Sequence, residues 1–136
     1  MSGRGIPLRL ASGPFLVWTG TRKLQHPERG EALLGSAAHS LPQLVDVFGN
    51  EPDRFARFLG GVELLLGAWV GSGVRPRASG LALAGFAAGT LSLLFTNPAN
   101  RVAGSRWEPS AQGMPIAKDL WLLAAGLSLA LDARRR

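Results

Sequence analysis

The chain has 136 residues, enough for one compact domain, and it is poor in charge. Charged residues make up 18% of it, below the roughly 25% of an ordinary soluble domain, and apolar residues make up 46%. The absence of cysteine excludes disulfides, iron–sulfur clusters and cysteine-ligated zinc. So few polar side chains also argue against a hydrolase cleft of Ser, His and Asp in a soluble domain.

The formal net charge of +6 raises the question of nucleic-acid binding. Such a surface needs clustered lysines and arginines, often interleaved with aromatic residues that stack on bases. The two lysines, Lys23 and Lys118, each lie beside a long apolar run, and the arginines are scattered except for the last three residues. We therefore expect no nucleic-acid partner and attribute the charge to membrane topology.

The first expected helix, residues 6–24, is the least apolar of four long candidates because Arg9 and Pro14 interrupt it. A cleaved signal peptide is the alternative, but that requires an uninterrupted apolar segment followed by small residues. Arg9 falls inside the segment, and Arg22 and Lys23 occupy the place of a cleavage site. We interpret the segment as a retained helix.

The other three candidates cover residues 55–73, 79–96 and 115–131, close to the roughly 20 apolar residues that span a bilayer. Residues 79–96 carry no charge, and apolar or small side chains surround that helix, as lipid or deep burial demands. A soluble bundle is the alternative, but so short a chain leaves little to bury such a helix. Residues 1–136 are therefore expected to form a single all-α domain, an integral membrane four-helix bundle.

The segment between the first two helices, residues 25–54, is expected to lie outside the membrane. Residues 31–39 could form two helical turns, and residues 41–48 a short amphipathic piece. Such pieces lie at the membrane interface. The sequence thus predicts a long outer loop that contains short interfacial helices.

Arginine density sets the expected orientation, because short cytoplasmic loops are enriched in basic residues. With four crossings both termini share a side. One side carries six arginines in two tails and one turn: Arg4, Arg75, Arg77, Arg134, Arg135 and Arg136. The other side spreads its arginines over a longer stretch: Arg22, Arg29, Arg54, Arg57, Arg101 and Arg106. Both termini are therefore expected in the cytoplasm.

Small residues predict close helix packing, since membrane helices associate through small faces. Gly85 and Gly89 form a GxxxG motif, with Gly80, Ala84 and Ala88 on a neighbouring face. The last helix has its own small residues, Ala125, Gly126 and Ala130. The GxxxG motif is interpreted as packing within the bundle, with a dimer interface as the alternative.

Ionisable side chains within the apolar segments are the candidate site. Glu63 lies about 12 Å into its helix, and a charge in hydrocarbon needs a partner. Lys23, Lys118 and Asp119 are the charges available near that depth, with hydroxyls from Thr19 and Thr21. We expect Lys23, Glu63, Lys118 and Asp119 to meet in an intramembrane polar cluster.

Three interpretations of this cluster stay open. It could be an ion-pair network that joins helices, or a cavity for a quinone headgroup, an anion or another small ligand. A proton path is the third, although no chain of carboxylates reaches the cytoplasmic side. His26 and His39 are expected to be solvated rather than metal or haem ligands.

Four short motifs lie in three of the expected helices. The first helix carries LRL at residues 8–10 and ends in WTGTRKL at residues 18–24. The other two motifs are GGVELLLG at residues 60–67 and AKDLWLLAAG at residues 117–126. Together they resemble the DoxX family of small four-helix bacterial membrane proteins, whose corresponding motifs read "aGxxKl", "xxEllgGlxLlxG" and "xKDlxLlgagl". The resemblance covers Lys23, Glu63, Lys118 and Asp119. It implies a bacterial plasma membrane location and an association with sulfur or quinone redox chemistry.

The expected function follows from this resemblance. The chain is interpreted as a multi-pass accessory or assembly subunit of a membrane redox complex, without catalytic activity of its own. Its expected partners are the lipid bilayer, subunits of a larger complex, or further copies of itself. The alternative is a stand-alone binder or transporter of a small ligand in a cavity around Glu63, Lys118 and Asp119, and a catalytic quinone reductase ranks third. No cofactor or metal is expected, and a bound quinone is the alternative.

Overall fold

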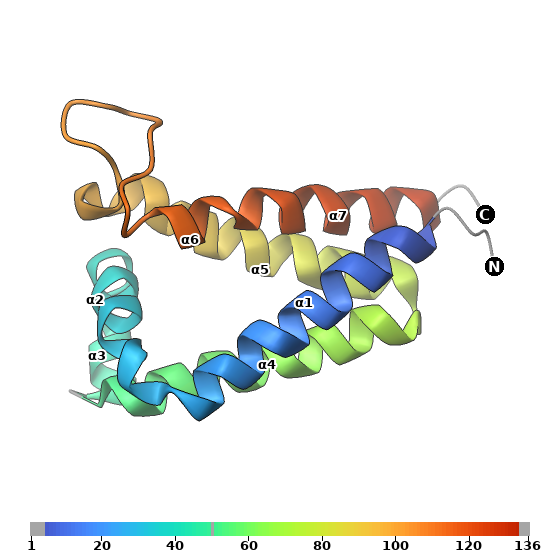
Figure 1. The fold of residues 1–136 in the computed structure, drawn as a ribbon, viewed down its shortest axis with the longest axis horizontal. Helices are drawn as coiled ribbons and strands as arrows, with labels where there is room; N and C mark the ends of the chain where they lie inside the picture. Colours follow the sequence, from blue (N-terminus) through green and yellow to red (C-terminus); the bar gives the residue numbers. More distant parts are fainter. Residues whose placement is uncertain (1–4, 50, 134–136) are drawn as a thin grey trace.

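The computed structural model describes residues 5–49 and 51–133, and the elements it forms there are helical. Four long helices run along the molecule: α1 (Ile6–Gln25), α4 (Pro52–Ser72), α5 (Pro76–Thr96) and α7 (Asp119–Asp132) (Figure 1). Within the described ranges no strand forms, apart from one isolated bridge between Arg101 and Pro109. The all-helical class expected from the sequence is confirmed.

Shorter helices connect the long ones. Between α1 and α4 lie η2 (Pro27–Arg29), α2 (Gly30–Ser40) and α3 (Gln43–Phe48), which run across one end of the molecule (Figure 1). Between α5 and α7 lie η3 (Pro98–Asn100) and α6 (Met114–Ala117), joined by a long connection that contains turns. Prolines occupy the first turn of α1, α4 and α5, where their missing N–H has no intrahelical partner to lose.

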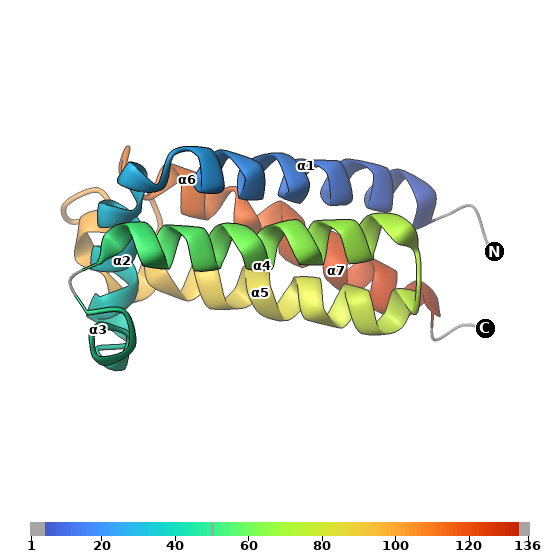
Figure 2. The same cartoon turned by 90° about the horizontal axis from the view of Figure 1, so that it is seen from below.

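The long helices form two antiparallel pairs, α1 with α4 and α5 with α7 (Figures 1 and 2). In the first pair, Gly13 lies against Gly67 and Gly20 against Gly60, and the two glycines of each helix are seven residues apart. A β-carbon on Gly67 would lie 2.7 Å from the carbonyl oxygen of Gly13. These glycines therefore allow the two backbones to approach more closely than any larger residue permits.

The second pair has its own close approach, between Gly80 of α5 and Gly126 of α7. A β-carbon on either one would lie 2.7 Å from the carbonyl oxygen of the other. By contrast, Gly85 and Gly89 are exposed, and a β-carbon on either would meet no heavy atom within 4 Å. The expectation that this GxxxG motif packs inside the bundle is therefore wrong, because its face points outward.

One apolar core joins the two pairs, and a smaller one closes one end. The main core takes buried side chains from all four long helices: Leu16, Leu66, Val70, Leu83, Ala87, Leu122, Ala125 and Leu129. The smaller one joins α2 and α3 to the start of α4 through Leu34, Ala37, Phe48 and Phe55. The rings of Phe48 and Phe55 meet edge to face at 5.2 Å, a favoured aromatic geometry.

The start of α1 and the end of α7 lie at the opposite end, where a β-carbon on Gly5 would touch Leu129. The turn between α4 and α5 lies at this end too, with Gly73 in the left-handed conformation that ends α4 (Figure 2). Arg75 and Arg77 are exposed there. The other arginines used for the orientation, Arg4, Arg134, Arg135 and Arg136, lie outside the described residues.

Two helical stretches are long and apolar enough to cross a membrane: α5 (Pro76–Thr96) and the combined stretch of α6 and α7 (Met114–Asp132). Only 33% of the apolar window of each is buried within the protein. Helices α1 and α4 are less apolar than α5 and α7. The structure thus supports two membrane-compatible helices by length and composition.

Candidate functional site

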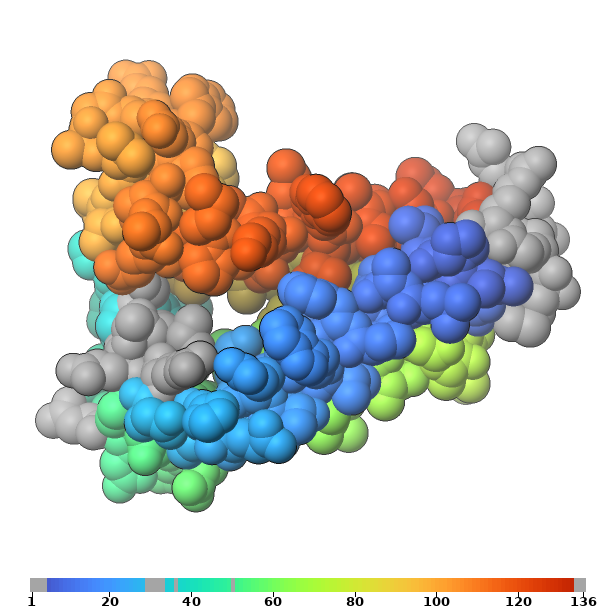
Figure 3. All heavy atoms as spheres, viewed as in Figure 1, coloured from blue at the N-terminus to red at the C-terminus, as the bar shows by residue number. Residues whose placement is uncertain are grey.

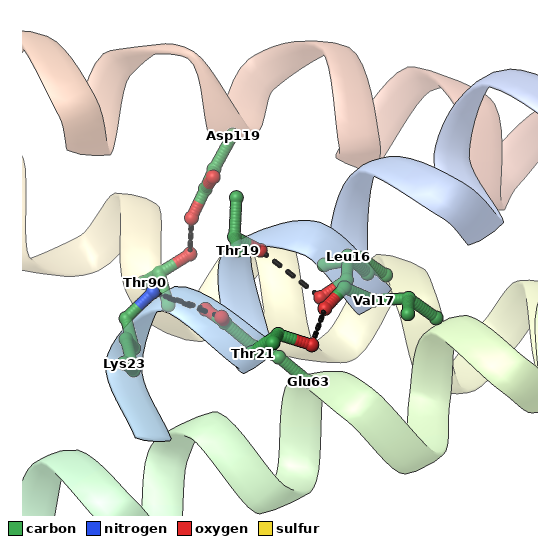
Figure 4. Close-up of polar contacts among 8 residues, drawn as sticks. All are labelled: Leu16, Val17, Thr19, Thr21, Lys23, Glu63, Thr90 and Asp119. Carbon is green, nitrogen blue, oxygen red and sulfur yellow. Dashed lines mark hydrogen bonds and ion pairs between the residues drawn. The ribbon is translucent and has the colours of Figure 1, made fainter. Parts of the chain in front are cut away.

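An ion pair between Lys23 and Glu63 joins α1 to α4. The Lys23 Nζ donates to both carboxylate oxygens of Glu63, at 2.9 Å and 2.8 Å (Figure 4). The Glu63 side chain is 8% exposed and that of Lys23 is 23% exposed. Because both oxygens face one ammonium group, the pair holds its two helices at a defined rotation and height.

The glycines one turn away explain why these two side chains meet. Gly20 precedes Lys23 by three residues and Gly60 precedes Glu63 by three, so in this antiparallel pair the two charged residues lie one turn to either side of the close backbone approach. A β-carbon on Gly60 would lie 3.0 Å from the Lys23 β-carbon, and one on Gly20 would lie 3.2 Å from that of Glu63. The tight helix contact therefore places the two side chains within reach.

A second polar contact joins α5 to α7. The Thr90 hydroxyl donates to a carboxylate oxygen of Asp119, and it also contacts the carbonyl oxygen of Ala87. Asp119 interacts electrostatically with both Glu63 and Lys23, across the boundary between the two helix pairs (Figure 4). Lys23, Glu63, Thr90 and Asp119, termed the polar cluster below, thus take one residue from each long helix.

The four residues expected in the cluster do not all meet. The structure brings Lys23, Glu63 and Asp119 together, but Asp119 bonds a hydroxyl rather than a lysine. Lys118 differs from the expectation, since its exposed side chain lines a separate cavity between α1 and α7. Consecutive residues on a helix point about 100° apart, so Lys118 and Asp119 cannot share one face.

The two threonines expected near the cluster bond within their own helix. The Thr19 hydroxyl donates to the carbonyl oxygen of Leu16 at 3.2 Å, and that of Thr21 to Val17 at 2.7 Å (Figure 4). Thr90 is the hydroxyl that the sequence interpretation missed. Its signal was available, because it lies in an uncharged helix near the expected depth of Asp119 and Glu63.

The chemistry of the polar cluster is that of a tie between helices. The Lys23 ammonium pairs with the Glu63 carboxylate, and the Asp119 carboxylate accepts a hydrogen bond from Thr90. Each of these functional groups therefore has a partner within the cluster. Among the described residues no three His, Cys, Asp or Glu side chains gather as metal ligands would. His26 contacts Glu28 at 3.1 Å on the surface, and His39 is exposed on α2.

The cavity beside Lys118 has a volume of about 460 Å³. Its walls come from α1, with Leu8, Ala11, Ser12 and Phe15, and from α7, with Trp121, Leu122 and Ala125. Volumes of about 300–1,000 Å³ and mostly apolar walls are typical of small-molecule sites. The chain therefore offers two distinct features, a polar cluster between the helix pairs and an apolar cavity with a cation at its rim.

The fold and these features define an all-helical protein with two helix pairs tied by buried polar contacts. No family model matches the chain, and neither does any curated protein or solved structure.

Proposed function

We propose that the chain is an integral membrane four-helix bundle of the bacterial plasma membrane. The observation that carries this proposal is the exposure of large apolar side chains along the outer faces of all four long helices. They include Leu10, Trp18, Phe58, Leu65, Leu81, Leu120, Trp121 and Leu127, each more than 45% exposed. A soluble protein rarely exposes so many large apolar side chains along its helices, whereas lipid requires them.

Burial separates this proposal from a soluble bundle with very apolar core helices. A core helix is covered by its neighbours, yet only 33% of the apolar stretch of α5 and of Met114–Asp132 is buried within the protein. The polar cluster lies between the helices instead of on the outer face, as expected for charges that lipid would penalise. The start of α1 and the end of α7 lie at the same end of the bundle. This arrangement accords with both termini in the cytoplasm.

We further propose a DoxX-like role, as an accessory or assembly subunit of a quinone-linked membrane redox complex. The support is the resemblance at Lys23, Glu63, Lys118 and Asp119, together with the mutual engagement of the polar cluster. A cluster whose groups bond each other stabilises a scaffold.

A second candidate function, a stand-alone binder of a small ligand, is favoured by the cavity between α1 and α7. Because Lys118 lines that cavity, the candidate ligand site lies there and not around Glu63 and Asp119. The two functions make different demands on the protein, since only the first needs partner subunits.

Topology is tested with single cysteines, because the chain has none of its own. Ala103 in the connection between α5 and α7 and Val74 in the turn between α4 and α5 are both exposed. In intact cells we expect a membrane-impermeant maleimide to label Ala103→Cys and to label Val74→Cys only after lysis. Recovery of the chain in the soluble fraction without detergent would overturn the membrane proposal.

The accessory role is tested by purification in mild detergent and mass spectrometry of the co-purified proteins and small molecules. We expect redox subunits with the wild-type chain and fewer of them with Glu63→Gln, which weakens the tie between α1 and α4. Arg57→Gln is the control, because it removes an exposed charge of the same helix α4 and leaves the tie intact. A chain recovered alone, with neither partner nor quinone, would contradict the redox role.

A further inference from the structure

The cavity between α1 and α7 contains two polar groups without partners. Ser12 lines the cavity and is 5% exposed, and its hydroxyl has no hydrogen-bond partner among the described residues. Lys118 lies at the rim, and its ammonium has no ion-pair partner in the described part of the chain. The Ser12 hydroxyl and the Lys118 ammonium are polar side-chain groups that line this cavity, and both can donate to a ligand with acceptor groups.

The apolar walls specify the rest of that ligand. Leu8, Phe15, Trp121 and Ala125 line the cavity, and none of the described lining residues is acidic. Because α1 and α7 run antiparallel, Lys118 and Phe15 lie toward the outer end while Leu8 and Ala125 lie deeper. From Lys118 to Ala125 the cavity extends seven residues along α7, about 10 Å. A complementary molecule has an anionic head, acceptor oxygens below it, and an apolar chain.

The position of the cavity decides which molecule of that description occupies it. The hollow between the blue atoms of α1 and the orange atoms of α7 opens on the outer face of the helix pairs (Figure 3). Lys118 lies four residues inside the span that begins at Met114, about 6 Å from its end, where a lysine reaches the headgroups. In a bilayer this hollow opens toward the surrounding lipid.

We propose that this cavity binds one anionic glycerophospholipid, which rests on the membrane location proposed above. The lipid phosphate pairs with Lys118, an ester carbonyl accepts the hydrogen bond of Ser12, and one acyl chain fills the apolar slot. The binding is non-covalent and needs neither the polar cluster nor a partner subunit.

The test is native mass spectrometry of the full chain, purified in detergent, delipidated, and offered equal amounts of phosphatidylglycerol and phosphatidylcholine with identical acyl chains. We expect about fivefold preferential retention of phosphatidylglycerol, the contribution of one cation near anionic lipid. Lys118→Gln should remove the preference and Lys118→Arg should keep it. Ser12→Ala should reduce the retention of both lipids, since both carry ester carbonyls.

Two controls make the result decisive. Arg57→Gln removes an exposed cation of α4 that lies away from this cavity, so the preference should survive. Added inorganic phosphate should not displace the lipid if the acyl chain contributes to binding. Preference that persists in Lys118→Gln, or that disappears equally in Arg57→Gln, would overturn the site while leaving the membrane location intact. Recovery without detergent would instead refute the membrane location itself.

Discussion

The carbonyl oxygen of Gly60 lies 2.6 Å from the position that a β-carbon on Gly20 would occupy. The contact is reciprocal, since a β-carbon on Gly60 would lie 2.8 Å from the carbonyl oxygen of Gly20. Both neighbours are backbone atoms, which cannot move aside as a side chain can. This crossing fixes the separation of α1 and α4 at a point between Lys23 and Glu63, whose side chains pair across it.

Gly20→Ala should therefore destabilise the protein. Overpacking costs about 1–3 kcal/mol, which exceeds the roughly 0.5–1 kcal/mol that alanine gains over glycine within a helix. The free energy of unfolding in detergent, followed by circular dichroism, measures the effect. Gly61→Ala is the matched control, because its β-carbon would meet nothing within 4 Å. Equal stability of the two variants would contradict the close approach.

The Lys23–Glu63 pair predicts a non-additive double-mutant cycle. Glu63→Leu leaves the partly buried Lys23 ammonium without its partner and should cost about 1–3 kcal/mol of unfolding free energy. Adding Lys23→Met should restore most of that loss, because the methionine needs no counter-charge. The cycle is measured by the same unfolding titration, and additive effects of the two substitutions would show that the pair is not coupled.

Thr90→Val should weaken the contact between α5 and α7. Valine matches threonine in shape but cannot donate to Asp119, and hydrogen bonds to charged groups contribute about 1.5–3 kcal/mol. Thr21→Val provides the comparison, since the Thr21 hydroxyl bonds only its own helix at Val17. In thermal unfolding, Thr90→Val should have a lower melting temperature than Thr21→Val. A lower melting temperature for Thr21→Val would contradict a stabilising role of the Thr90 hydroxyl in the polar cluster.

The connection between α5 and α6 should be sensitive to substitution at Gly113. A β-carbon there would lie 1.8 Å from the carbonyl oxygen of Asn100, a fully buried residue whose side chain donates to Leu93 at 2.9 Å. Gly113→Ala should displace this connection and accelerate its cleavage in limited proteolysis. Ala103→Ser, at an exposed position of the same connection, should leave the cleavage rate unchanged.

Sequence periodicity and hydropathy predicted helices well because both depend on local composition. The expected range 6–24 corresponds to α1 at Ile6–Gln25, and the range 79–96 to α5 at Pro76–Thr96. The early start of α5 follows from Pro76 in its first turn, a residue that lies between the two ranges expected to be helical. Short helices in the outer loop were also expected, and α2 and α3 lie there.

Pairing between helices could not be predicted in the same way. The GxxxG motif at Gly85 and Gly89 predicted the wrong packing face of α5. A glycine spacing alone does not specify which neighbouring helix a face contacts. The glycines in contact, such as Gly13 and Gly67, belong to different helices and form no local motif. Likewise, the separation of Lys118 from Asp119 depends on the rotation of α7, which composition alone does not fix.

If the chain is a membrane protein, as proposed above, the pairing of Lys23 with Glu63 has a consequence for its insertion into a bilayer. Inserted alone, α1 or α4 would carry an uncompensated ion, at about 2.5–3.5 kcal/mol each on insertion scales. Because the two helices follow each other as long segments and touch along their glycines, they can enter as one hairpin whose opposite charges already cancel. We therefore expect biogenesis in two steps, with the α1–α4 hairpin and the α5–α7 hairpin inserted as separate units that then dock.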